Sequence, residues 1–170
     1  MQLKNTYSAR EVAAMTGLSA RQLQWWDARR LFAPAVASKR TEAGGFTERR
    51  YTPVDLLELM VLADLRKQGF SVARIRRLLE TLRSKFGIRL FDAIGGAGTI
   101  TLLTDGRDVY ARTGTGEFYD LLRAPEQPLL VLGSNLPLRE LTAKTDKKPK
   151  KKRPTAPTPS KSPPRSPTTR

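Results

Sequence analysis

The stretch YSAREVAAMTGLSARQLQWWDARRLFAP, residues 7–34, decides the fold of this chain. Within it, Gly17 is suited to the left-handed backbone conformation that often ends a helix. Two pairs of residues have the spacing of a capping box, which satisfies the free N–H groups at a helix start: Ser8 with Glu11, and Ser19 with Gln22. The stretch therefore predicts two short helices joined by a tight turn, a helix-turn-helix whose second helix would lie in a DNA major groove.

Helical geometry sorts the side chains of that second helix, residues 19–29. At about 100° per residue, Leu23 and Trp26 share one face, and Arg21 and Trp25 lie on the opposite one. We therefore expect Trp26 in the core and Trp25 at the DNA or against a neighbouring segment. Arg21 falls in the first turn, where a recognition helix usually meets base edges, so it can pair with guanine or hold a phosphate. A plain surface charge is the alternative for Arg21.

Composition excludes several classes of function. The 170 residues include no cysteine and no histidine, which removes disulfides, thiolate metal sites and the commonest general base. No apolar run reaches the roughly 18 to 20 residues of a membrane span, and the N-terminus lacks the apolar core of a signal peptide, so we expect a cytoplasmic protein. The net charge of +15 favours a polyanionic partner.

The distribution of charge divides the chain into three predicted parts. Residues 1–86 carry 16 basic and 8 acidic side chains, and residues 87–143 carry 5 and 7. Residues 144–170 carry 10 basic side chains against 1 acidic one. These changes coincide with shifts in composition, so we expect a DNA-binding domain, a small middle unit and a basic tail.

The first part continues with a predicted β-hairpin and two further helices. Residues 35–50 contain Gly44-Gly45 between basic residues, as in a wing that lies against the phosphate backbone, although a solvated loop is the alternative. Thr52-Pro53 opens an apolar third helix and Ser71 opens a fourth. We expect the arginine-rich face of that fourth helix to be solvated; it comprises Arg74, Arg76, Arg77 and Arg83.

Residues 7–83 resemble the winged helix-turn-helix domain of the MerR family of bacterial transcription regulators. That family begins with a pattern of the type E-V-A-x-x-T-G-[VL]-S-x-R-x-L-R-Y-Y-[ED]-x-x-G-L-x-x-P. The matching positions are Glu11-Val12-Ala13, Thr16-Gly17-Leu18-Ser19, Arg21, Leu23, Trp25-Trp26-Asp27, Leu31 and Pro34. Later matches are Arg49, Tyr51, Thr52, Asp55 and Leu56, then Leu65-Arg66, Gly69-Phe70-Ser71-Val72, Ile75-Arg76 and Leu78-Leu79.

Three departures from the family pattern matter for the interpretation. The second arginine of the recognition helix is Gln24, which could read adenine or bond a phosphate, and the paired tyrosines are tryptophans. The usual Gly-Tyr of the wing is displaced to Gly45-Phe46, which predicts a longer wing. The resemblance implies dimers on a near-palindromic promoter site. The long helix that usually forms the dimer is missing, because Gly87 and the glycines at 95–98 interrupt it.

Residues 87–143 predict a small, mostly antiparallel β-rich (α+β) unit that could pair with a second copy or a partner. Residues 88–94 predict one short helix or turn, and Asp105-Gly106 predicts a two-residue hairpin turn. Residues 117–122 predict a strand or short helix. Pro125 and Pro128 are expected to bracket a turn. A short buried strand, Leu129-Leu130-Val131-Leu132, should follow it, and residues 136–141 should form a last edge element. The glycines at 95–98 lack the lysine of a phosphate loop and favour a hinge.

Residues 144–170 contain seven of the twelve prolines and almost nothing apolar. Such a segment cannot bury enough surface to offset ordering, so we expect a disordered basic tail that tethers the protein to polyanions. A tail that only improves solubility is the alternative.

The leading hypothesis is a sequence-specific DNA-binding transcription regulator with no catalytic residues, no cofactor and no metal. We expect double-stranded DNA and a second copy as partners, RNA polymerase as a further candidate, no membrane, and a place in the cytoplasm at the nucleoid. The alternatives are an architectural or recombination-accessory protein of excisionase type, and an antitoxin-like interaction module. The candidate DNA-binding residues are Ser19, Arg21, Gln22, Gln24, Trp25, Arg29, Lys39, Arg40, Arg49, Arg50 and Tyr51.

Overall fold

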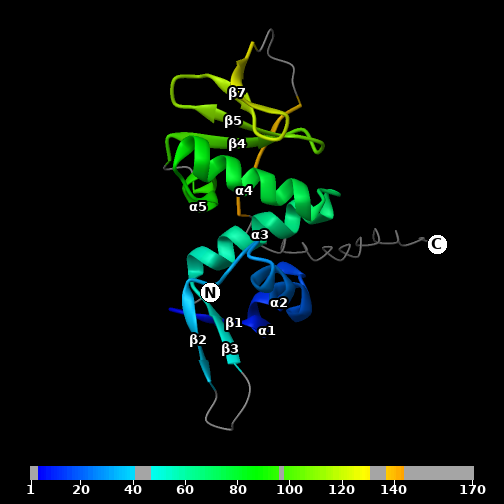
Figure 1. Cartoon of the computed structure of the whole chain (residues 1–170), viewed down its shortest axis with the longest axis vertical. Coiled ribbons are helices and arrows are strands. Elements are labelled where there is room, and N and C mark those ends of the chain that lie inside the picture. Colours follow the sequence, from blue (N-terminus) through cyan, green and yellow to red (C-terminus); the bar gives the residue numbers. More distant parts are fainter. Residues whose placement is uncertain (1–3, 41–46, 96–97, 131–136, 144–170) are drawn as a thin grey trace, which may run out of the picture.

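In the part of the chain that the structure describes, five helices lie between a β-hairpin at one end of an elongated molecule and a β-sheet at the other (Figure 1). This computed structural model describes residues 4–40, 47–95, 98–130 and 137–143. The predicted wing turn at Gly44-Gly45, the residues Val131-Leu132 and the basic tail lie outside the described residues.

The predicted helix starts and stops are confirmed. The side chains of Ser8, Ser19 and Thr52 each accept a hydrogen bond from the backbone N–H three residues on, and Gly17 ends the first helix at φ 76°. Hydrogen bonds from Lys4 and from the Ser8 backbone lower the pKa of Glu11 to about 2. The helices are α1 Ala9–Thr16, α2 Ala20–Ala28, α3 Pro53–Lys67, α4 Val72–Phe86 and α5 Leu90–Ile94.

The segment predicted to be a wing forms an antiparallel hairpin in a three-stranded sheet of order β1-β3-β2. Tyr7 pairs with Tyr51, and Val36 pairs with Arg50. The strands are β1 Tyr7–Ser8, β2 Val36–Arg40 and β3 Thr47–Tyr51. The first residues of the deciding stretch thus close the sheet from which the hairpin extends.

The middle of the chain folds into an antiparallel sheet of order β7-β6-β5-β4-β8, as the sequence predicted in outline. Gly98 lies before its first strand, where an added Cβ would clash with the carbonyl oxygen of Asp92, so this position requires glycine. The strands are β4 Ile100–Thr104, β5 Val109–Thr113, β6 Phe118–Asp120, β7 Ala124–Leu129 and β8 Arg139–Glu140.

Three predictions in this part of the chain are wrong. The β4–β5 connection has four residues, because Thr104 pairs with Val109, and Asp105 accepts hydrogen bonds from the backbone of residues 107 and 108. The prolines at 125 and 128 do not bracket a turn but lie within β7, an edge strand, where a missing N–H is tolerated. Leu130 is 92% exposed, so the predicted strand 129–132 is not buried there.

Helix α3 is the centre of the buried core. Its side chains Leu59, Leu62 and Leu65 are fully buried, and it contacts α1, α4, α5 and β3. The buried cluster continues through α4 and α5 into the five-stranded sheet, since α4 packs on β7 and α5 on β4. Helix α4 ends at the predicted domain boundary between residues 86 and 87, with Gly87 at φ 65°. Because the buried cluster runs across this point, the division into two domains stays a prediction.

A buried carboxylate joins α4 to the sheet. Asp108, whose side chain is 5% exposed, lies 2.7 Å from the Arg74 guanidinium and 2.6 Å from that of Arg123. Arg74 also donates to the Arg107 carbonyl and stacks over the Phe70 ring. The prediction of a solvated arginine face is thus wrong for Arg74, because the sheet that packs beside α4 supplies its partners.

We expect Asp108→Ala to lower the free energy of unfolding by about 1–2 kcal/mol, because it leaves two arginines without their shared partner. Arg123→Ala should cost less than about 1 kcal/mol, since Asp108 keeps Arg74 and Arg123 is largely exposed. Urea unfolding of the two variants measures the difference. An equal cost for both would contradict the assignment of Asp108 as the shared centre.

Candidate nucleic-acid interface

The outer face of α2 carries the side chains predicted to meet DNA. Arg21 and Gln24 are exposed, and Trp25 is 43% exposed, whereas Trp26 is 2% exposed. The Arg29 guanidinium lies over the Trp25 ring, 5.4 Å from its centroid. This cation–π contact holds an aromatic face and a positive charge side by side at the C-terminal end of α2.

The residues at the start of α2 are engaged in its cap. The Ser19 side chain accepts from the Gln22 backbone, and the Gln22 side-chain oxygen accepts from the Ser19 backbone at 2.7 Å. The Gln22 side-chain amide, which the cap does not use, remains a donor. The first turn of α2 is therefore fixed in place with Arg21 pointing away from the core.

An ion pair fastens the hairpin to α2. The Arg49 Nε of β3 lies 2.6 Å from the Asp27 Oδ2, and both side chains are about a quarter exposed. On the other side of α2, Arg76 of α4 donates to the Arg29 carbonyl at 3.2 Å. Sequence reasoning did not identify Asp27 or Arg76 as positioning residues, although both match the family pattern.

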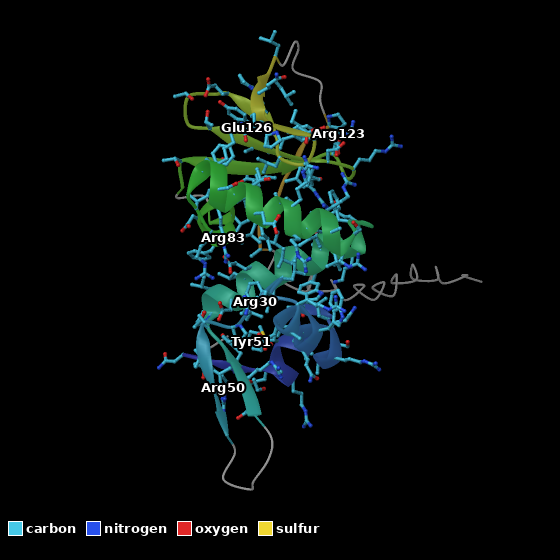
Figure 2. The ribbon with its side chains drawn as sticks, viewed as in Figure 1. Arg30, Arg50, Tyr51, Arg83, Arg123 and Glu126 are labelled. Atoms are coloured by element: carbon cyan, nitrogen blue, oxygen red, sulfur yellow. The ribbon has the colours of Figure 1, made fainter. Side chains whose placement is uncertain are left out.

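The remaining hairpin candidates are divided between surface and core. Arg50 pairs with Glu48 at 3.0 Å and is partly exposed. Lys39 and Arg40 belong to β2, and their side chains lie outside the described residues. Tyr51 is 1% exposed, and burial raises the pKa of its hydroxyl. Tyr51 in this structure is a core residue and does not reach a surface that DNA could contact (Figure 2).

Residues 7–82 match the family described as MerR HTH family regulatory protein. This part of the chain is therefore similar to the MerR family. Similar proteins include uncharacterized HTH-type transcriptional regulators of Mycobacterium bovis and of Mycobacterium tuberculosis strains H37Rv and CDC 1551. Each is 29% identical over 136 residues, which are 80% of this chain and 56% of the relative. The chain thus spans little more than half the length of these relatives.

The residues that the structure describes contain neither a membrane-spanning helix nor a metal-binding cluster. Among them, no helix combines the length and apolarity required to cross a membrane. The same residues contain no group of three or more acidic side chains arranged to hold a metal ion.

The two tryptophans of α2 should respond differently to truncation. Trp26→Ala should lower the free energy of unfolding by about 3–5 kcal/mol, because it opens a cavity in the core. Trp25→Ala should change it by less than about 1 kcal/mol, because that side chain lies at the surface. Chemical unfolding measures both, and a large loss of stability for Trp25→Ala would show that this residue is structural.

Proposed function

We propose that the protein is a sequence-specific DNA-binding transcription regulator that places α2 in the major groove. The observation that carries the proposal is the outer face of α2, where Arg21, Gln24, Trp25 and Arg29 project away from the core. Arginine and glutamine side chains can read guanine and adenine edges there, and the Trp25 indole supplies an apolar surface and one donor.

In this proposal the β2–β3 hairpin acts as the wing of a winged helix-turn-helix. The Asp27–Arg49 ion pair sets its position relative to α2. Arg50 of β3, together with Lys39 and Arg40 of β2, would meet the sugar-phosphate backbone that flanks the groove. Contacts there add affinity and register rather than sequence information. Arg49 has a positioning role, because its guanidinium is already bound to Asp27.

The other parts of the chain have proposed roles that follow from charge and topology. Residues 1–86 bind DNA, and the unit of residues 87–143 supports a homodimer or contacts RNA polymerase. The tail of residues 144–170, with 10 basic side chains, adds contacts to phosphates that salt weakens. The protein acts at the nucleoid in the cytoplasm, without enzymatic activity.

Selection of bound fragments from a genomic library tests the function. The full chain should enrich a small set of sites. Arg21→Ala should reduce the preference for those sites over others, because each lost base contact removes about 1–3 kcal/mol of discrimination. Arg112→Gln, on the exposed side of β5, removes the same charge far from α2 and serves as the matched control.

A uniform loss of affinity in Arg21→Ala would make Arg21 a phosphate contact and leave sequence reading to other residues. Enrichment of no site by the full chain would contradict regulation. It would favour the architectural function, in which the net charge of +15 coats or bends DNA without sequence preference.

A further inference from the structure

A partly enclosed cavity of about 490 Å³ lies at the C-terminal end of α2, where Asp27 and Ala28 form part of its wall. Its walls come from the end of α2 and the segment after it, from α3, from the end of α4 and from the start of α5. The apolar part of the wall includes Leu31, Phe32, Leu79, Ile88 and Leu90. A cavity of this size fits a small organic molecule.

The charges in the wall leave an excess of positive charge. The two carboxylates are neutralised, Asp27 by Arg49 at 2.6 Å and Glu58 by Arg89 at 2.8 Å. Arg30 and Arg83 also line the cavity, and among the described residues neither makes an ion pair or a side-chain hydrogen bond (Figure 2). Two guanidiniums are therefore available at one hollow whose wall is about half apolar.

The backbone at Arg30 is strained. With φ 52°, Arg30 has the one positive φ found outside glycine in the described part of the chain. It follows α2 in the left-handed position that ends a helix, where the N–H of Leu31 donates to the Trp26 carbonyl. The family pattern has glycine there, and glycine would adopt this conformation without strain. An arginine side chain at a strained backbone position indicates a use for that side chain.

We propose that this cavity binds a small organic anion, in which a carboxylate or phosphate group meets Arg30 and Arg83 and an apolar body packs on the wall. Guanidiniums suit both anions because their parallel N–H groups match two oxygens at once. The apolar residues exclude water around that contact, which strengthens it. An inorganic anion alone would leave most of the apolar wall uncovered.

Occupancy of the cavity also affects the proposed DNA surface. Asp27 and Ala28 of α2 form part of the wall, so the ligand adds negative charge at the C-terminal end of the helix that carries Arg21 and Trp25. That charge opposes the attraction of phosphates. The bound anion should therefore weaken DNA binding, a consequence that rests on the proposed function, whereas the binding site itself does not.

Titration of the full chain with the fluorescent anion anilinonaphthalene sulfonate tests the site. Octanoate and octyl phosphate should displace this probe, and their relative potency distinguishes a carboxylate from a phosphate ligand. Neutral 1-octanol, with the same apolar chain, should not displace it at equal concentration. Displacement by 1-octanol as effective as by the two anions would overturn the proposal, since the arginines would then contribute nothing.

Three variants separate ligand binding from folding. Arg83→Gln should lower the affinity for octanoate at least about tenfold, because a hydrogen bond from a charged donor is lost. Arg112→Gln should bind octanoate as the wild type does. Arg30→Gly should also weaken octanoate, yet raise the thermal unfolding midpoint by about 2–4 °C because the strain is removed. Unchanged octanoate affinity in both Arg83→Gln and Arg30→Gly would overturn the site.

Octanoate should weaken binding of the full chain to its selected DNA site at least threefold, and this effect should be lost in Arg83→Gln. Unchanged DNA affinity under saturating octanoate would overturn the regulatory consequence. If the chain selects no DNA site at all, the proposed function fails. The octanoate titration still shows whether the cavity binds an organic anion.

Discussion

Two buried carboxylates on one face of α3 hold the structure together. Asp55 is fully buried, and its Oδ2 accepts hydrogen bonds from the backbone of Thr52 at 2.8 Å and Ala35 at 3.1 Å. Glu58, one turn later, accepts from the Arg89 side chain and from the Phe91 backbone. Buried charges are stable only with such partners. Asp55 thus holds the chain leaving α2, and Glu58 holds the start of α5.

This frame explains how a short helix can present a fixed surface. Helix α2 has only nine residues, too few to be stable alone, and its position comes from the buried Leu23 and Trp26 and from contacts at both flanks. The hairpin reaches it through Arg49, and α4 reaches it through Arg76. The same arrangement encloses the cavity at the C-terminal end of α2, so the proposed DNA face and the proposed anion site share one helix.

Local signals predicted much of the fold. Caps at Ser8, Ser19 and Thr52 depend on residues three positions apart, so the sequence alone locates them. Long-range contacts were not visible: Arg74 meets Asp108 across 34 positions, and this partner changes a solvated arginine into a structural one. The apolar run after Pro128 suggested a buried strand, but the edge strand β7 ends at Leu129, and Leu130 is exposed. The cavity combines four separate segments, which the sequence does not bring together. The left-handed backbone at Arg30 did have a sequence signal, because arginine stands where the family pattern has glycine.

Site-directed cleavage of DNA tests the central claim most directly, that the outer face of α2 meets the DNA. The chain has no cysteine, so a single introduced cysteine can carry an iron chelate that cuts nearby DNA. With the label at Ala20→Cys, in the first turn of α2, cleavage should fall within the selected site. With the label at Thr115→Cys, in the exposed β5–β6 turn, that site should remain uncut. Cleavage from Thr115→Cys and none from Ala20→Cys would contradict the account.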